Sequence, residues 1–308
     1  MIVHGHGRTH TLKRTLRLRA VAKINAGLKI LGKRPDGYHE LRTIYQTIGL
    51  ADRLEISVSQ GKNAIAIECD NPVLPSGPGN LVYHTCELWR RARRWSGKID
   101  IQLEKVIPLG SGLGGASTDA AATILGLEHL TGDRLDFGAR YRLAAALGSD
   151  VPLFLLGGRV LGCGRGEEVY PLTDLPPRAC LVVFPGFSVS TKEAYRDAGL
   201  RLTERSRASY TGKFGAWPQF PLVSWGPAEN DFEYVVFARW PELARLKRRL
   251  IRAGAEVASL TGSGSAVYAL FPSSRQMTLA SKLIPKGWLS FRTRTLARAD
   301  YHQGLFAD

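Results

Sequence analysis

The middle of the chain contains a glycine-rich run, Pro108-Leu109-Gly110-Ser111-Gly112-Leu113-Gly114-Gly115-Ala116-Ser117-Thr118-Asp119. Glycine allows backbone conformations with positive φ and leaves no side chain between the backbone N–H groups and a ligand. An apolar pattern with helical spacing follows over 120–127, and Ser117, Thr118 or Asp119 could cap that helix. Unpaired N–H groups at a helix N-terminus bind anions. The run therefore predicts a site for the phosphates of a nucleotide.

Two other nucleotide-binding motifs fit this run less well. Gly110, Gly112 and Gly115 satisfy the dinucleotide pattern G-x-G-x-x-G, and Asp133 could contact a ribose. However, the run begins a third of the way along the chain, and Pro108 interrupts the strand that should precede it. A P-loop is excluded because no lysine precedes Ser117. The run alone indicates nucleotide phosphate and leaves the fold open.

Asp150 and Lys23 are candidates for acid–base chemistry. Asp150 stands between an expected helix end and the apolar segment 151–154, where loss of solvent would suit a catalytic base. Such an aspartate is also often only a turn cap. Lys23 and Asn25 lie on one face of an apolar strand among small residues. Lys23 is therefore either a functional lysine or an edge residue that faces solvent.

Tyr38 and His39 directly follow a Pro-Asp-Gly sequence. This sequence favours a tight turn, which would present an aromatic ring and an imidazole side by side. Such a pair suits a planar ligand, and the alternative is a hairpin with a surface aromatic residue.

The elements that must position these residues alternate between strands and helices. Strands are predicted over 16–28, 43–50, 53–58, 64–68, 99–107, 180–184, 256–260, 266–271 and 291–297, and helices over 80–95, 120–130, 135–147, 191–198, 231–238, 241–253 and 275–283. A hairpin is expected over 157–167, and the segment 201–226 reads as a long irregular loop. A second glycine turn, Thr261-Gly262-Ser263-Gly264-Ser265, separates two of the later strands. The second half therefore predicts an α+β sandwich.

Length and composition limit the class of protein. A chain of 308 residues has room for one large or two ordinary domains, and no apolar run is long enough to span a membrane. The four cysteines form no C-x-x-C pair and follow no secretory signal, so we expect reduced thiols in the cytoplasm. Residues 1–15 read as a disordered basic extension, on which His4, His6 and His10 make a poor preformed metal site.

The net charge of +15 raises the question of nucleic-acid binding. Much of this charge comes from the basic runs 90–94 and 245–252 on expected helix faces, with no interleaved base-stacking motif. A solvated basic face that attracts a polyanionic small substrate is the favoured interpretation, and nucleic-acid binding is the minority one.

Three segments resemble, in order, the three motifs of the GHMP small-molecule kinases: Ala22-Lys23-Ile24-Asn25, the run 108–121 and Leu260-Thr261-Gly262-Ser263-Gly264. Four more resemble the branch that phosphorylates the 2-hydroxyl of a cytidine diphosphate-linked methylerythritol in non-mevalonate isoprenoid synthesis: Arg34-Pro-Asp-Gly-Tyr-His-Glu-Leu41, Gly79-Asn-Leu-Val82, Leu147-Gly-Ser-Asp-Val-Pro152 and Gly162-Cys-Gly-Arg-Gly-Glu167. The resemblance covers about 16–297. A homoserine or mevalonate kinase is the alternative, which should lack Pro-Asp-Gly-Tyr-His.

The resemblance implies a role for each matching residue. Asp150 would take the proton from the substrate hydroxyl, with Lys23 beside it. The implied substrate-binding residues are Asn25, Tyr38, His39, Asp150, Thr191, Tyr195, Gly262, Ser263 and Gly264, of which Tyr38, His39 and Tyr195 would hold the cytosine. The implied ATP-binding residues are Asn80, Leu81, Lys105, Pro108, Leu109, Gly110, Ser111, Gly112, Leu113, Gly114, Gly115, Ala116, Ser117 and Thr118. The chemistry of ATP adds Mg²⁺, with Ser117 or Thr118 as a ligand.

The resemblance also implies the architecture. The family has an α+β fold with an N-terminal domain like ribosomal protein S5 domain 2, here 16–163, and a C-terminal ferredoxin-like α/β sandwich, here 164–308. The active site would lie between them. We expect a small cytidine diphosphate substrate as partner, no nucleic acid, no membrane, and a monomer or weak homodimer. Val21 stands where the family usually has proline, which should alter strand entry more than chemistry.

Overall fold

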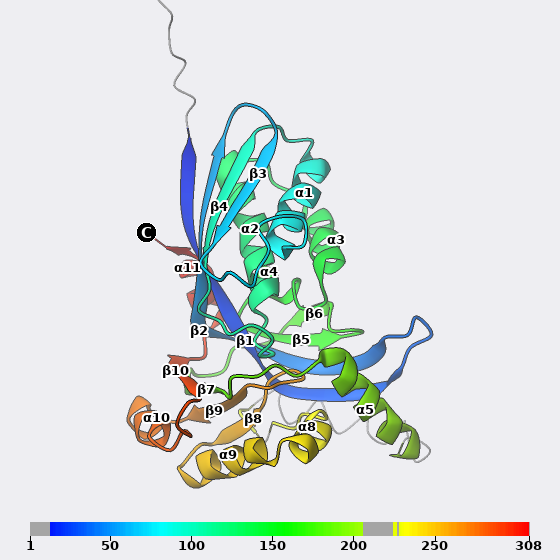
Figure 1. Ribbon diagram of the computed structural model, residues 1–308, viewed down its shortest axis with the longest axis vertical. Helices are drawn as coiled ribbons and strands as arrows, with labels where there is room; N and C mark the ends of the chain where they lie inside the picture. Colours follow the sequence, from blue (N-terminus) through cyan, green and yellow to red (C-terminus); the bar gives the residue numbers. More distant parts are fainter. Residues whose placement is uncertain (1–12, 206–223, 227, 308) are drawn as a thin grey trace, which may run out of the picture.

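The structure of the protein, a computed structural model, describes residues 13–205, 224–226 and 228–307 (Figure 1). The expected Pro35-Asp36-Gly37 turn joins two long antiparallel strands, β1 (Arg14–Lys33) and β2 (His39–Ser59). Gly37 has a φ of +86°, which glycine adopts without strain. The two strands predicted over 43–50 and 53–58 are one strand, because pairing with β1 continues through residues 51 and 52.

The first sheet has the order β11-β1-β2-β4-β3, and β5 pairs with both β2 and β6. Its further strands are β3 (Ala64–Cys69), β4 (Lys98–Glu104), β5 (Arg159–Cys163), β6 (Glu168–Pro171) and β11 (Phe306–Ala307). The helices α1 (Leu81–Arg93), α2 (Gly115–Thr131), α3 (Phe137–Leu147) and α4 (Leu153–Leu156) lie on one side of the sheet. Ile56 and Ile101 of the sheet pack with Trp89 of α1 and Leu127 of α2 in one core.

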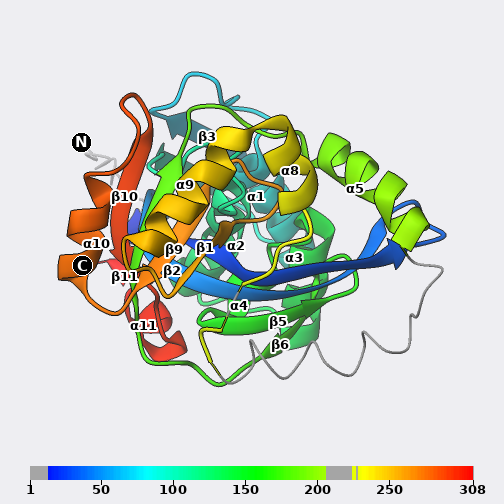
Figure 2. The same ribbon diagram turned by 90° about the horizontal axis from the view of Figure 1, so that it is seen from below.

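The second sheet has the order β10-β7-β9-β8, with every pair antiparallel. Its strands are β7 (Ala179–Phe184), β8 (Val257–Leu260), β9 (Val267–Phe271) and β10 (Leu289–Arg294). The helices α8 (Glu233–Arg239), α9 (Pro241–Arg252) and α10 (Ser274–Ser281) cover one face, as the view from below in Figure 2 shows. This arrangement confirms the α+β sandwich expected for the second half.

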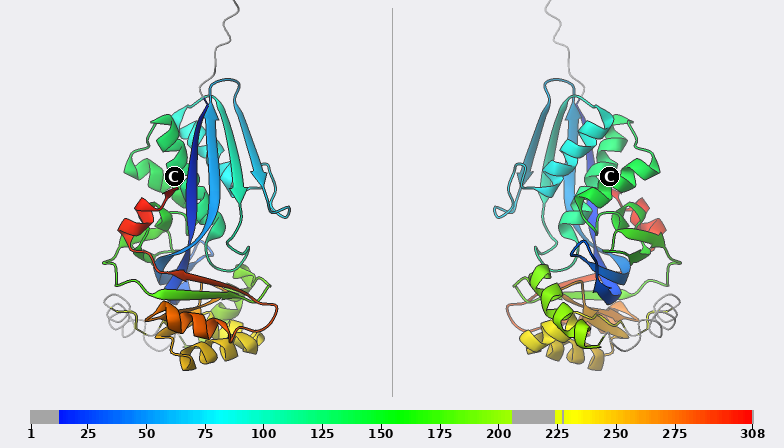
Figure 3. Two further views of the ribbon diagram at one scale, coloured as in Figure 1. Left: turned by 90° about the vertical axis from the view of Figure 1, so that its left-hand side faces the viewer. Right: turned by 90° about the vertical axis from the view of Figure 1, so that its right-hand side faces the viewer.

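The other face of the second sheet packs against β1 and β2. Ala22 and Ile24 of β1 share a core with Val182 of β7 and Leu270 of β9. Figure 3 shows the strands of the second sheet running across those of the first at this junction. The phosphate run, Lys23 and the 261–265 turn all lie next to this junction, so its packing fixes their relative positions.

Several segments differ from expectation. The boundary expected between residues 163 and 164 falls inside the β5–β6 hairpin, and the unpredicted α11 (Arg298–Gln303) and β11 return the chain to the first sheet. β1 already begins at Arg14, inside the extension expected over 1–15. α5 (Thr191–Arg205) continues past 198, so 201–205 is helical rather than irregular.

Two predicted segments lie outside the described residues. They are residues 1–12, with His4, His6 and His10, and residues 206–223 of the expected irregular loop. Over the described ranges, we find no helix with the length and apolar character needed to cross a membrane.

Candidate active site

The glycine-rich run forms a loop that leads from β4 into α2. Gly110, Gly112 and Gly114 have φ values of +63°, +82° and +78°. Apart from the tight turn at 109–110, no backbone N–H group from 109 to 117 donates a backbone hydrogen bond within the described part of the chain. The loop thus presents a row of unpaired donors at the N-terminus of a helix, as an anion site requires.

The start of α2 corrects one expectation. Gly114, in the left-handed conformation, occupies the N-cap position, and Ser117, Thr118 and Asp119 lie within the helix. The positive φ at Gly114 turns the chain into the helix before these side chains are reached. Asp119 is therefore a buried residue of α2 and not its cap.

The loop is anchored to both β1 and the second glycine turn. The Lys23 N–H donates to the Leu113 carbonyl over 2.9 Å, and the Thr261 hydroxyl donates to the Gly112 carbonyl over 3.1 Å. A Cβ atom at Gly112 would lie 2.2 Å from the Thr261 carbonyl oxygen. The three segments that resemble the kinase motifs therefore meet at one place, and glycine at 112 allows the contact.

Gly112→Ala is expected to lower the free energy of unfolding by ~1–3 kcal/mol, because the new methyl group must push the loop away from Thr261. Gly132→Ala is the matched control, since Gly132 also has a positive φ, +74°, but a Cβ there meets no atom within 4 Å. Urea unfolding measures both variants. Equal free energies of unfolding for the two variants would show that the close contact between Gly112 and Thr261 does not require glycine.

Lys23 and Asp150 form an ion pair beside this loop. The Lys23 Nζ lies 3.3 Å from the Asp150 Oδ2, and a Cβ atom at Gly114 would lie 3.1 Å from the Lys23 Cγ. The Lys23 side chain is 3% exposed and that of Asp150 is 30% exposed. A carboxylate that is open on one side, held by an ammonium group and next to an anion site, has the parts needed to deprotonate an alcohol during phosphoryl transfer.

Asn25 connects the first and third of these segments. Its Oδ1 accepts hydrogen bonds from the Lys23 Nζ and the Gly262 N–H, both over 2.8 Å. Its Nδ2 donates to the Thr43 hydroxyl over 2.7 Å. The Ser263 hydroxyl of the same turn lies 2.9 Å from the Thr191 hydroxyl at the start of α5. Asn25 is buried, so its amide positions Lys23 and the 261–265 turn.

Of the three aromatic candidates, Tyr38 and His39 lie at the turn that joins β1 and β2, and Tyr195 lies on α5. His39 stacks on Tyr195, with ring centroids 4.8 Å apart and an angle of 13° between the planes. Tyr38 is largely exposed, and the Arg165 guanidinium lies 4.7 Å from its ring centroid. Burial and the charge of Lys33 lower the pKa of His39, which favours the neutral imidazole.

Three residues expected near the nucleotide have structural partners. Asn80 caps α1 by accepting a hydrogen bond from the Val82 N–H, and Leu81 packs against the core of the first sheet. The Lys105 ammonium is buried between two carboxylates, Asp52 and Asp119. Asp133, the candidate ribose ligand of a dinucleotide fold, pairs instead with Arg93 of α1.

The cluster of Asp52, Lys105 and Asp119 had no signal in the sequence, where Asp119 was only one of three possible helix caps. The Asp52 Oδ1 accepts the N–H groups of residues 106 and 107, directly before the phosphate loop, over 2.6 and 2.7 Å. Burial raises the pKa of Asp119 to about 8, against the lowering effect of Lys105. Burial lowers the pKa of Lys105, but the charges of Asp119 and Asp52 outweigh it and keep the ammonium protonated. The cluster ties β2 to the entry of the loop and to α2.

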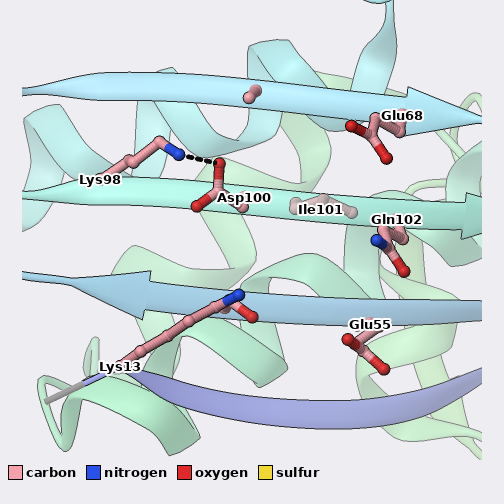
Figure 4. A pocket seen from close by; sticks show the side chains of 9 residues that line it. Lys13, Glu55, Glu68, Lys98, Asp100, Ile101 and Gln102 are labelled. Carbon is pink, nitrogen blue, oxygen red and sulfur yellow. Dashed lines mark ion pairs between the residues drawn. The ribbon is translucent and has the colours of Figure 1, made fainter.

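A shallow pocket lies on the face of the first sheet that is turned away from α1, α2 and α3 (Figure 4). Lys13, directly before β1, and charged side chains of β2, β3 and β4 line it, and Lys98 pairs there with Asp100 over 2.8 Å. It contains none of the residues assembled around Asp150.

Both halves of the chain match models of a known protein family. The GHMP kinases N terminal domain matches residues 80–158, and the GHMP kinases C terminal domain matches residues 223–286. The 4-diphosphocytidyl-2-C-methyl-D-erythritol kinase of Solibacter usitatus is 44% identical over 92% of this chain and 90% of its own length. The Geobacter sulfurreducens enzyme of the same name is 35% identical over 91% of this chain and 99% of its own length.

Solved structures give the same result. A crystal structure of 4-(cytidine 5'-diphospho)-2C-methyl-D-erythritol kinase matches with a TM-score of 0.71 and 31% identity, over 92% of this chain and 99% of that one. A homoserine kinase from Cytophaga hutchinsonii matches with a TM-score of 0.66 at 18% identity, over 96% of this chain and 97% of that one, and shares the fold alone. The chain is therefore a two-domain GHMP kinase and belongs to the family of 4-diphosphocytidyl-2-C-methyl-D-erythritol kinases.

Proposed function

We propose that this kinase transfers the γ-phosphoryl group of ATP to the 2-hydroxyl of 4-diphosphocytidyl-2-C-methyl-D-erythritol. The relatives at 35–44% identity carry the name of this activity. The observation that supports it most directly is the contact of 3.3 Å between Lys23 and Asp150 beside a loop of unpaired N–H groups. A coupled ADP-release assay with this alcohol, homoserine and mevalonate tests the proposal. Turnover of homoserine or mevalonate in preference to the cytidine substrate would reject it.

Asp150 is the proposed base. Its carboxylate takes the proton of the substrate hydroxyl as the hydroxyl oxygen forms a bond to the γ-phosphorus. The bond between this phosphorus and the oxygen that bridges to the β-phosphate breaks, and its electron pair leaves with ADP. Lys23 holds the Asp150 Oδ2 and balances negative charge near the reacting groups.

The phosphates of ATP would lie along the N–H groups of residues 109–117, at the N-terminus of α2. The described residues include no cluster of three or more His, Cys, Asp or Glu side chains around one point. Mg²⁺ commonly binds substrate phosphates together with one or two protein oxygens, so it would bind the ATP phosphates here and would neutralise their charge. Ser117 is the favoured protein ligand because it is partly exposed, whereas Thr118 is buried.

Three aromatic side chains near the turn of the β1–β2 hairpin would hold the cytosine: Tyr38, His39 and Tyr195. Arg165 covers one face of the Tyr38 ring, which leaves the other face for a base. The free thiols of the four cysteines support action in the cytoplasm, where thiols stay reduced, and we propose a monomer or weak homodimer.

Tyr38→Ala is expected to lower kcat/KM for the cytidine substrate roughly tenfold or more, since aromatic–base stacking contributes ~1–3 kcal/mol per base. The Kd for ATP should not change, because the phosphate loop lies elsewhere. Tyr170→Ala is the matched control, since Tyr170 of β6 is 53% exposed and Tyr38 is 55% exposed. Unchanged kcat/KM in Tyr38→Ala would make Tyr38 a simple surface aromatic.

A further inference from the structure

Tyr45 contacts the proposed base directly and was not singled out by the sequence. It lies on β2 with only 2% of its surface exposed. Its hydroxyl lies 2.9 Å from the Asp150 Oδ1 and donates a hydrogen bond to it. Lys23 holds the other carboxylate oxygen, Oδ2, at 3.3 Å. Each oxygen of the carboxylate therefore has its own donor on a strand of the first sheet.

We propose that Tyr45 is a positioning residue for Asp150. Its hydroxyl fixes the rotation of the carboxylate about the Cβ–Cγ bond and stabilises the ionised form that accepts the substrate proton. This inference rests on the proposed function of Asp150 as the base. Tyr45 itself touches no reacting atom in this scheme, because its effect passes through the Asp150 Oδ1.

Two glycines of the β5–β6 hairpin leave the space that the Tyr45 side chain fills. A Cβ atom at Gly162 would lie 2.5 Å from the Tyr45 Cε2, and one at Gly166 would lie 2.4 Å from the Tyr45 hydroxyl oxygen. Any side chain at either position would therefore displace the ring or its hydroxyl. The Lys23 Nζ also lies 5.6 Å from the Tyr45 ring centroid. These contacts restrict the movement of the Tyr45 ring, so its hydroxyl can contact Asp150 in only a small range of positions.

The hydroxyl is a donor throughout the physiological pH range. Burial, followed by the negative charge of Asp150, raises the pKa of Tyr45 well above its usual value. Four other groups lie near the Tyr45–Asp150 pair: Lys23 of β1, Tyr195 of α5, Glu167 of the β5–β6 turn, and the Gly166 carbonyl. Burial and the charge of Asp150 raise the pKa of Tyr195, which is therefore also neutral. The Gly166 carbonyl lies 3.4 Å from the hydroxyl, so the shorter hydrogen bond goes to Asp150.

Tyr45→Phe removes one oxygen atom and keeps the ring, its packing and its contact with Lys23. We expect kcat to fall about tenfold to a hundredfold, as expected for loss of a hydrogen bond to a charged group. The KM for the cytidine substrate and the Kd for ATP should stay within about twofold.

Tyr301→Phe is the matched control. Tyr301 is also fully buried, and its hydroxyl donates to the Phe154 carbonyl, away from Asp150. This variant also loses one buried tyrosine hydroxyl hydrogen bond, here to a backbone carbonyl, so the loss of stability in the two variants can be compared by thermal unfolding. Its kcat and its KM for the cytidine substrate should match those of the wild type.

A double-mutant cycle decides whether Tyr45 acts through Asp150. In an Asp150→Asn background, Tyr45→Phe should lower kcat less than twofold, because no base remains to be positioned. An unchanged kcat in Tyr45→Phe alone would overturn the proposal. A raised KM with unchanged kcat, or an undiminished loss of kcat in the Asn background, would overturn it as well. If Asp150→Asn itself keeps near-normal turnover, the base assignment fails, and the positioning role fails with it.

Discussion

Asp150→Asn is expected to fold and to bind ATP as the wild type does, with kcat lower by ~10²–10⁴, the usual contribution of a general base. The amide has the shape of the carboxylate but cannot take the substrate proton. Its carbonyl oxygen can still accept the hydrogen bond of Tyr45, and the side chain lies in a partly exposed place. The loss should therefore appear in turnover, with little change in the free energy of unfolding.

Asp100→Asn is the matched control for this variant. Asp100 is 32% exposed and pairs with Lys98 over 2.8 Å, which resembles the exposure and partner of Asp150 without the neighbouring phosphate loop. A coupled ADP-release assay should show wild-type turnover for Asp100→Asn. Near-wild-type turnover in Asp150→Asn, measured beside it, would reject Asp150 as the base.

The parts of the site that depend on local backbone chemistry were predictable from the sequence. Gly110, Gly112 and Gly114 indicated a loop with positive φ that leads into a helix, and the structure confirms that conformation. Pro35-Asp36-Gly37 indicated the turn before Tyr38 and His39. Each of these features follows from residues that are close together in the chain, so spacing alone carries the information.

The contacts that cross the fold were not predictable in the same way. Tyr45 had the pattern of an ordinary strand aromatic, and only the pairing of β2 with β1 and β5 brings its hydroxyl to Asp150. Asp52 stood where two strands were expected to separate, although β2 continues through it. Lys105 had a charge and a position that suited a phosphate, but long-range packing gives it two carboxylate partners.

Lys105→Met is expected to lower the free energy of unfolding by ~3–5 kcal/mol, because it leaves buried carboxylates without their counter-charge. The Lys105 side chain is 3% exposed and that of Asp52 is fully buried, so water cannot replace the ammonium. The Asp119 Oδ1 already has no hydrogen-bond partner among the described residues, which leaves the Oδ2 contact with Lys105 as the main compensation for its burial. Lys98→Met removes a surface ion pair and should cost at most ~1 kcal/mol.

The pH dependence of this loss separates a structural lysine from a nucleotide contact. Without the ammonium, the pKa of Asp119, already raised by burial, rises further above its value in the unfolded chain. The folded variant then binds more protons than the unfolded one, so its stability falls as pH rises. Urea unfolding at several pH values should show a deficit that changes little up to the wild-type Asp119 pKa of about 8 and grows above it, and Asp119→Asn in the same chain should remove this growth. A Lys105→Met variant with wild-type stability but weakened ATP binding would instead make Lys105 the phosphate contact that its sequence position indicates.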